Sequence, residues 1–221
     1  MHAHKHDHEH AHDPSMSEEE FRRFNKQFYL DKEEYDWVKV TDSVKGFETL
    51  FHRGRQRAVR RLLAKYGAPP YLDAGCGTGL MLRHLPPGSV GVDINPRNLP
   101  KARYNAPGKD VMQADLEHLP VRPGSLSTIV MTEVLEHFPN PGDVLAHLVT
   151  RLRPGGRLIG TVPSKSLIWR LRFLSSSCPA EEPFHKNYEK ADLRALLSKD
   201  FSSVKLGITN TSMSIYFVAT K

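Results

Sequence analysis

Apolar and polar residues follow a helical pattern over the first third of the chain. Phe21, Phe24 and Phe28 recur at the three- to four-residue spacing of an amphipathic helix, and Ser17 stands before three glutamates. A serine followed by acids is typical of a helix start, because it caps backbone N–H groups and places negative charge at the positive end of the helix dipole. We therefore expect an N-terminal helical cap over residues 16–66.

Beyond residue 67 the pattern changes to short apolar runs separated by stretches with helical spacing. The runs are strand candidates, and strands that are continuously apolar and alternate with helices are typical of a parallel sheet covered on both faces. Strands are expected at residues 70–74, 89–93, 110–114, 126–132 and 157–162, and helices at residues 96–104 and 141–152.

The C-terminal end has a third pattern. Two β-rich runs, residues 202–208 and 214–220, lie close together in the sequence and predict an antiparallel hairpin that closes the sheet. The whole pattern predicts an α/β fold: a Rossmann-like, seven-stranded mixed sheet, parallel with a C-terminal antiparallel hairpin, and helices on both faces. We expect residues 16–221 to form one domain.

Composition agrees with a folded chain and excludes several classes of protein. Of the 221 residues, 39% are hydrophobic and 25% are charged, which is enough apolar material for a sizeable core. No apolar run approaches the roughly 18–20 residues of a membrane span, and no secretory signal opens the chain. The two cysteines, Cys76 and Cys178, exclude a disulfide framework and a four-cysteine zinc site. We therefore expect a cytoplasmic protein.

Residues 1–15 are set apart by histidine at every even position from His2 to His12. We expect a disordered affinity tag before a native start at Met16, and the alternative is a metal-chelating tail.

The excess of basic residues does not by itself indicate a function. The net charge is +6 and the isoelectric point is about 9.3. The basic residues gather between Arg53 and Arg61 and again between Lys165 and Arg172. Such a balance suits nucleic acid, an acidic membrane surface and an anionic small substrate alike, so charge alone selects no partner.

A glycine-rich segment carries the most information about function. Asp73 ends a predicted strand, and glycines follow at the alternate positions Gly75, Gly77 and Gly79 before a predicted helix. Glycine there permits a tight turn and lets a ligand approach the backbone amides. Asp93 ends the next strand, where a carboxylate can accept hydrogen bonds from both hydroxyls of a ribose. The spacing departs from the pyrophosphate-binding G-x-G-x-x-G pattern, and Asp73 would repel a pyrophosphate but tolerate a cationic sulfonium and amino group.

The glycine segment, the strand that ends at Asp93 and the stretches at residues 113–120 and 152–158 resemble the motifs of class I S-adenosylmethionine-dependent methyltransferases. The subgroup they resemble is related to the quinone-biosynthesis (ubiquinone and menaquinone) methyltransferases, and the likeness covers about residues 55–165. It implies an enzyme that takes a methyl group from S-adenosylmethionine and releases S-adenosylhomocysteine.

The resemblance also implies which residues hold this cofactor. Asp73 would bind its amino group, Asp93 its ribose and Asp115 its adenine amino group, and Arg53 or Arg57 would be a candidate partner for its carboxylate. The complete set of implied cofactor contacts is Asp73, Gly75, Cys76, Gly77, Gly79, Asp93, Ile94, Asp115 and Leu116.

A second group of polar residues follows the fourth predicted strand. If the segment from Glu133 to His137 forms a helical turn, then Glu133, Glu136 and His137 share one face. Together with the later His185, this set resembles the metal site of small-RNA 2′-O-methyltransferases and of some quinone O-methyltransferases. One alternative is a magnesium, manganese or zinc site that lowers the pKa of a substrate hydroxyl. The other is metal-free catalysis, in which Glu133 contacts the cofactor and His137 or His185 is the general base.

The acceptor is predicted less closely than the cofactor. Residues 164–190 are expected to form a substrate-side insertion, in which residues 165–174 are either an amphipathic lid that contacts a membrane surface or an ordinary helix. We expect methyl transfer to an oxygen or carbon of a small acceptor that is lipid-like or glycosylated. The alternatives are a metal-dependent RNA 2′-O-methyltransferase and a non-catalytic cofactor-binding module. Nucleic acid is not expected as a partner, because no added RNA-binding domain fits and aromatic residues do not interleave with the basic cluster. The pattern predicts no oligomeric state.

Overall fold

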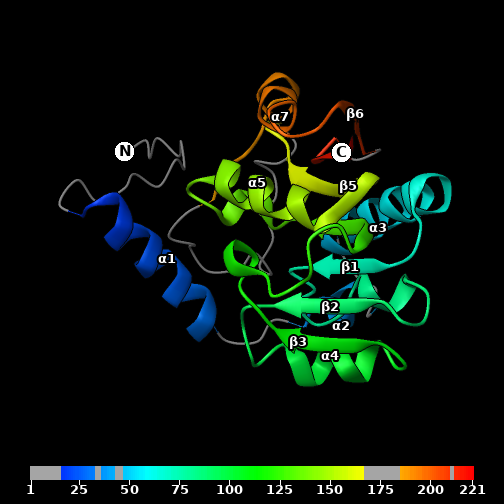
Figure 1. Ribbon diagram of the computed structural model, residues 1–221. Helices are drawn as coiled ribbons and strands as arrows, with labels where there is room; N and C mark the ends of the chain where they lie inside the picture. Colours follow the sequence, from blue (N-terminus) through cyan, green and yellow to red (C-terminus); the bar gives the residue numbers. More distant parts are fainter. Residues whose placement is uncertain (1–15, 33–35, 43–46, 167–184, 210–211) are drawn as a thin grey trace, which may run out of the picture.

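The computed structural model describes residues 16–32, 36–42, 47–166, 185–209 and 212–221 (Figure 1). The histidine-rich residues 1–15 lie outside the described residues. So does most of the expected substrate-side insertion, including residues 167–174 of the amphipathic segment.

A mixed seven-stranded sheet forms the centre of the fold, with strand order β3-β2-β1-β4-β5-β7-β6 (Figure 1). The first five strands pair in parallel, whereas β7 lies antiparallel between β5 and β6. This confirms the predicted parallel sheet and its C-terminal hairpin. The strands are β1 (Tyr71–Ala74), β2 (Val90–Asp93), β3 (Asp110–Gln113), β4 (Leu126–Thr132), β5 (Leu152–Pro163), β6 (Ser203–Ile208) and β7 (Ser214–Thr220).

Helices cover both faces of the sheet, and β4 shows why. Successive side chains of a strand point to opposite faces. Ile129 and Met131 pack in a core cluster with apolar residues of α5 (Pro141–Arg151) and α7 (Lys190–Leu197). Val130 points the other way and packs with residues of α3 (Phe47–Tyr66) and α4 (Leu99–Asn105). The continuously apolar sequence of β4 is therefore explained by burial on two sides.

The predicted helical character of residues 16–66 is confirmed by α1 (Glu18–Asp31), α2 (Trp37–Asp42) and α3. Helix α1 begins with the expected cap, in which the Glu20 N–H donates to Ser17 Oγ at 3.3 Å and the Ser17 N–H donates to Glu20 Oε2 at 2.8 Å. Unlike α3, α1 lies off the faces of the sheet, on the side where β1 and β2 end (Figure 1).

Two local predictions were wrong. The helix expected directly after the glycine segment is only the short 3-10 helix η1 (Leu82–His84), because Pro86 and Pro87 follow and a residue before proline disfavours helical geometry. Strand β5 begins at Leu152 instead of residue 157, so it includes residues 153–156, where Gly155 has a φ of 73°. Among the described residues, no helix has the length and apolarity needed to cross a membrane.

Gly160 of β5 allows a test of the packing at the centre of the sheet. A Cβ at this position would collide with the backbone carbonyl of Met131 and lie 2.8 Å from Phe217 Cζ, and both neighbours are buried. We expect Gly160→Ala to lower the free energy of unfolding by about 2–3 kcal/mol, as measured by urea denaturation.

The matched control is Gly142→Ala in the first turn of α5, where a Cβ would meet nothing within 4 Å. This change should alter stability by less than about 1 kcal/mol. Equal stability of the two variants would contradict the packing described for β4 and β5.

Candidate functional site

The glycine segment forms a loop between β1 and η1. Gly75, Gly77 and Gly79 have φ values of 73°, 51° and 91°, a region that residues with a Cβ rarely adopt. The N–H groups of Gly75 and Cys76 both donate to the carbonyl oxygen of Val92, at 2.9 and 2.8 Å. The loop is thereby anchored to the end of β2.

Asp93 is the last residue of β2 and is 9% exposed. Its Oδ2 accepts a hydrogen bond from the Gly77 N–H at 2.8 Å, and its Oδ1 accepts from the Asn95 N–H at 2.9 Å and from Asn98 Nδ2 at 3.1 Å. Burial raises the pKa of Asp93, and these hydrogen bonds oppose that rise. Each carboxylate oxygen has more than one lone pair, so the same group could also accept from ribose hydroxyls.

Asp73 is only 1% exposed, and its Oδ2 has no hydrogen-bond partner among the described residues. Burial, together with the nearby Asp93, raises the pKa of Asp73 to about 7. A buried polar oxygen without a partner is uncommon in folded proteins, and a ligand ammonium group would satisfy it. The chemistry of this position fits the amino group of S-adenosylmethionine and does not fit a pyrophosphate.

Three more of the predicted cofactor contacts lie in or close to the glycine loop: Cys76, Gly79 and Ile94. Burial raises the pKa of the Cys76 thiol, so this side chain is an uncharged packing residue and only its backbone can face a ligand. A Cβ on Gly79 would lie 3.2 Å from the backbone of Ala102, which shows that this glycine allows close packing on α4. Ile94 follows Asp93 and is partly exposed.

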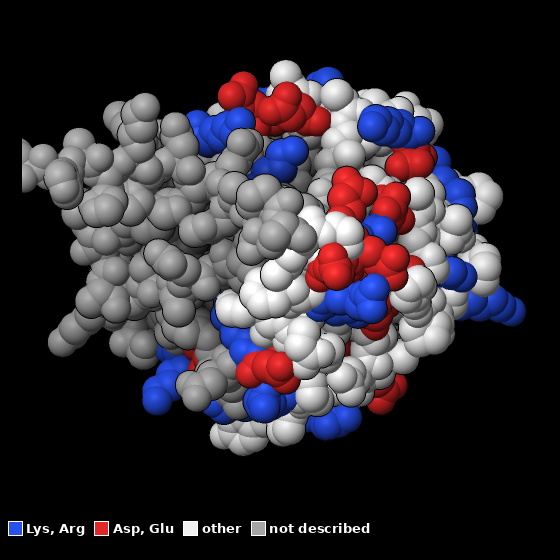
Figure 2. Space-filling view, turned by 90° about the vertical axis from the view of Figure 1, so that its left-hand side faces the viewer, with Lys and Arg blue, Asp and Glu red and all other residues white. Residues whose placement is uncertain are grey.

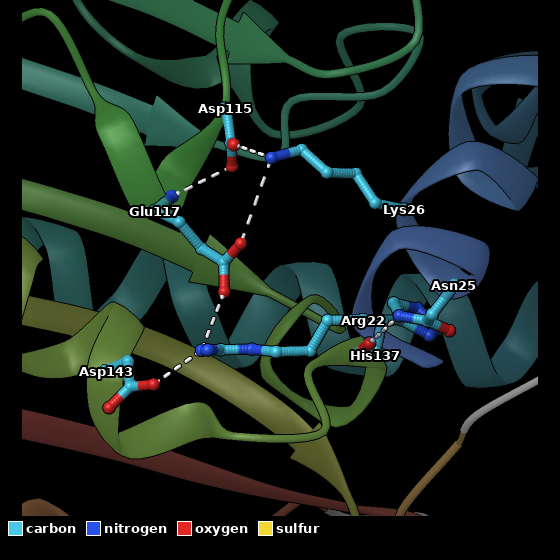
Figure 3. Close-up of polar contacts among 7 residues, drawn as sticks. All are labelled: Arg22, Asn25, Lys26, Asp115, Glu117, His137 and Asp143. Carbon is cyan, nitrogen blue, oxygen red and sulfur yellow. Dashed lines mark hydrogen bonds and ion pairs between the residues drawn. The ribbon is translucent and has the colours of Figure 1, made fainter. Parts of the chain in front are cut away.

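Asp115 caps the 3-10 helix η2 (Leu116–His118) and contacts α1 (Figure 3). Its Oδ1 accepts from the Glu117 N–H at 3.0 Å, and its Oδ2 forms an ion pair with Lys26. The next residue, Leu116, is buried. Asp115, which the resemblance assigns to the adenine, thus lies after β3 and is ion-paired with α1.

Further contacts join α1 to other elements after the strands. Arg22, one turn before Lys26, pairs with Glu117 at 3.2 Å and with Asp143 of α5 at 2.5 Å (Figure 3). Asn25 Nδ2 donates to the backbone carbonyl of His137 at 2.9 Å. Arg22 and Lys26 were not predicted as site residues, although their four-residue spacing on the polar side of an amphipathic helix is a usable signal.

The C-terminal end of α1 is fixed next to the turn that follows β2. Asn95 Nδ2 donates to the carbonyl of Lys32 at 2.8 Å, and Arg97 donates to the carbonyls of Leu30 and Asp31 at 3.2 and 2.8 Å. Acidic and basic side chains are interspersed over the described part of the face that α1 occupies (Figure 2). Complementary charges, and not a single-sign patch, therefore characterise this part of the surface.

Glu133 follows β4 with a φ of 54°, a left-handed conformation that is uncommon for a residue with a side chain. Its carboxylate accepts from Ser214 Oγ at 3.1 Å and lies 3.6 Å from a guanidinium nitrogen of Arg55. The 3-10 helix η3 (Leu135–His137) starts only after Glu133. Glu133 therefore does not share a helical face with Glu136 and His137, contrary to the prediction.

Arg55 is the buried member of the arginine cluster. Arg57 is exposed, and Arg53 Nε donates to the carbonyl of Thr41 at 3.2 Å. The spacing of the buried residues His52, Arg55 and Val59 is helical, so periodicity could have identified Arg55 as the inward-facing arginine.

The two predicted catalytic histidines lie close together. The His137 and His185 ring centroids are 5.5 Å apart. His137 Nδ1 is 2.8 Å from the Tyr29 hydroxyl of α1, and His137 Nε2 is 4.0 Å from Oε1 of Glu136, which is 1% exposed. Tyr29 is thus an unexpected polar neighbour of a candidate base.

The predicted metal ligands do not form a recognisable centre. Over the part of the chain that the structure describes, no group of three or more His, Cys, Asp or Glu side chains is arranged to hold a metal ion. Glu136 and His137 are adjacent, whereas Glu133 contacts Ser214 and Arg55.

Comparisons with known proteins show that the chain is similar to methyltransferases. A family described as a methyltransferase domain matches residues 51–200. The chain is 29% identical over 184 residues to the uncharacterized methyltransferase YodH of Bacillus subtilis, across 73% of this chain and 78% of that protein. It is 25% identical over 154 residues to a probable S-adenosylmethionine-dependent methyltransferase of Mycolicibacterium smegmatis, across 68% of this chain and 58% of that protein. It is 27% identical over 155 residues to a ubiquinone biosynthesis O-methyltransferase of Aeromonas salmonicida, across 60% and 65%. The match thus spans less than two thirds of the last two relatives.

A solved structure shows the same fold. The magnesium protoporphyrin IX methyltransferase of Synechocystis with bound SAM superposes with a TM-score of 0.65 and 19% sequence identity, across 95% of this chain and 100% of that one. The family match covers more than half of the chain, and the strand order is that of the predicted Rossmann-like sheet. The chain therefore belongs to the class I S-adenosylmethionine-dependent methyltransferases.

Proposed function

We propose that this methyltransferase acts on an oxygen or carbon of a small acceptor that is held after β4, beside His137. The observation that carries the proposal is the placement of two groups of residues around β1. Strand β1 pairs with β2 on one side and with β4 on the other, and ligands of such sheets bind at the carboxyl ends where the order reverses. Asp73 lies near the end of β1, Asp93 ends β2 and Asp115 follows β3, whereas His137 follows β4 on the second side.

The first group is proposed to hold the cofactor. Asp93 accepts from the ribose hydroxyls, Asp115 accepts from the adenine amino group, and Asp73 pairs with the amino group of the methionine part. The loop from Gly75 to Gly79 contributes backbone atoms and shape. Buried, preorganised carboxylates of this kind suit a ligand that carries both hydroxyl donors and positive charge.

The second group is proposed to position the acceptor and to remove its proton. S-adenosylmethionine supplies, when bound, an electrophilic methyl group on a sulfonium. The chain contributes in-line positioning and a base, because an oxygen or carbon acid loses a proton when it is methylated. His137 and His185 are the candidate bases, and Glu133, held by Ser214 and Arg55, lines the same side.

The nature of the acceptor rests on fewer observations. The ubiquinone O-methyltransferase relative supports a hydroxyl acceptor. A lipid-like body is supported only by the interleaved apolar and basic residues of the sequence at 165–174. The comparisons favour neither the RNA nor the non-catalytic alternative.

The experiment is a labelled-methyl transfer assay with this chain. The chain is incubated with methyl-labelled S-adenosylmethionine and a panel of catechols, prenylated phenols, hydroxy acids, β-dicarbonyl compounds and short RNAs. Label on a small hydroxyl or carbon acid supports the proposal. Label on RNA alone, or no label on any acceptor, contradicts it.

Asp93 gives a prediction about cofactor binding. We expect Asp93→Ala to raise the Kd for S-adenosylhomocysteine by about 100-fold, because two charge-assisted hydrogen bonds to the ribose are lost. Isothermal titration calorimetry measures this change, and circular dichroism checks that the fold is kept. Asp110→Ala is the control, since Asp110 is an exposed carboxylate at the opposite end of the adjacent strand. An unchanged Kd in Asp93→Ala would remove the ribose assignment.

Asp73 gives a prediction about pH. Burial raises the pKa of Asp73 in the folded protein to about 7, from an ordinary value of 3.8. Between about pH 4 and pH 7 the unfolded chain therefore binds fewer protons at this residue than the folded protein, and stability falls as pH rises through that window. We expect wild type to lose stability on the order of a few kcal/mol relative to Asp73→Asn between pH 4 and pH 8, as measured by urea denaturation.

Saturating S-adenosylhomocysteine should reduce this loss in wild type, because its ammonium group would pair with the ionised Asp73. Parallel stability curves for wild type and Asp73→Asn would contradict the raised pKa of the buried Asp73 carboxyl.

A further inference from the structure

Tyr29 reaches the end of β4 from a helix that is also tied to the proposed cofactor side. Lys26 of α1 forms an ion pair with Asp115. At the end of the same helix, the carbonyl of Lys32 accepts a hydrogen bond from Asn95 Nδ2. These contacts come three residues before and three residues after Tyr29. Tyr29 therefore lies on the side of α1 that faces the strand ends, between the cofactor anchors and His137.

The contact between Tyr29 and His137 involves one nitrogen of the imidazole. Tyr29 Oη lies 2.8 Å from Nδ1, and the two rings are tilted by 49° with centroids 4.9 Å apart. The other nitrogen, Nε2, lies 4.0 Å from Oε1 of the buried Glu136. A carboxylate at this distance favours a proton on Nε2, since two acceptors facing each other would repel. A neutral ring with its proton on Nε2 can accept only at Nδ1, which is the atom that the Tyr29 hydroxyl occupies.

The Tyr29 hydroxyl would then lie between the His137 imidazole and an acceptor bound next to Tyr29. If His137 accepts at Nδ1, then the Tyr29 O–H is the donor in their hydrogen bond, and a second molecule reaches this imidazole through the phenol oxygen. The ammonium group of Lys32 lies 5.5 Å from the centroid of the Tyr29 ring, so a cation is close to this phenol.

We infer that Tyr29 is a further catalytic residue, whose hydroxyl takes the acceptor's proton while its own proton passes to His137 Nδ1. This inference rests on the proposed function. The acceptor oxygen or carbon forms its bond to the methyl carbon with the electron pair of its former bond to hydrogen. The methyl–sulfur bond breaks, and sulfur keeps that electron pair. Tyr29 stays neutral, His137 becomes an imidazolium next to Glu136, and this proton is released to water after the product leaves.

The tautomer of His137 is the first test, and it requires no acceptor. Nitrogen-15 NMR of the histidine rings is recorded on the full chain in its wild-type form and as Tyr29→Phe, with His137→Gln used to assign the signal. We expect the proton of His137 on Nε2 in wild type, and a shift of the Nδ1 signal toward that of an acceptor without a hydrogen bond in Tyr29→Phe. Tyr104→Phe is the matched control, because Tyr104 of α4 is 85% exposed, and it should leave the signal unchanged.

A wild-type proton on Nδ1 would overturn the inference, because Nε2 would then be the accepting atom and Tyr29 would only orient the ring. An Nδ1 signal that is the same in wild type and Tyr29→Phe would overturn it as well.

The second test uses an acceptor identified by the labelled-methyl assay. We expect Tyr29→Phe to lower kcat by about 100-fold, the range typical of lost acid–base catalysis, with the Kd for S-adenosylhomocysteine within twofold of wild type. Undiminished kcat in Tyr29→Phe would refute the relay and leave the proposed function standing. The opposite result, an intact Tyr29–His137 hydrogen bond in a chain that methylates no acceptor, would refute the proposed function and with it the catalytic role of Tyr29, and would leave only the hydrogen bond.

Discussion

The reversal of strand order at β1 is the constraint on which the site depends. Because β1 lies between β2 and β4, the segments that leave these neighbouring strands diverge at one edge of the sheet. The glycine loop and Asp93 come from one side of the reversal, and Glu133 and His137 come from the other. Residues far apart in the sequence are thereby brought to one edge of the sheet by the hydrogen bonds between strands.

Helix α1 joins the two sides, and its contacts are individually weak. Arg22, Lys26 and their acidic partners are partly exposed, and ion pairs of that kind contribute roughly 0–1 kcal/mol each. Phe21 is the buried apolar anchor of the helix, whereas Phe24 is 50% exposed. The sheet therefore sets the positions of Asp93 and His137, and α1 adds Tyr29 through a surface that is stabilised by several small terms.

Most of the sheet and the cofactor side could be predicted from the sequence because their signals are local. A strand that ends in an acid, followed by glycines that need positive φ, is readable from adjacent residues, as at Asp73 and Gly75. The apolar runs of β4 and β7 identified buried strands for the same reason. The helix expected after the glycine loop was predicted wrongly, because Pro86 and Pro87 follow the short η1 and disfavour a longer helix.

The acceptor side could not be predicted to the same depth, because its contacts depend on docking between distant segments. Tyr29 and His137 are separated by 108 positions, and no periodicity relates them. The left-handed φ of Glu133 removed it from the helical turn that the spacing of Glu133 and His137 predicts.

We propose that cofactor and acceptor meet at the reversal of strand order, and that α1 contacts the residues on both sides of it. A crystal structure of the chain with S-adenosylhomocysteine tests it most directly. We expect the ribose on Asp93, the amino group beside Asp73, the adenine near Asp115 and the sulfur directed toward Tyr29 and His137. S-adenosylhomocysteine bound away from the glycine loop, or with its sulfur turned away from the end of β4, would contradict the account.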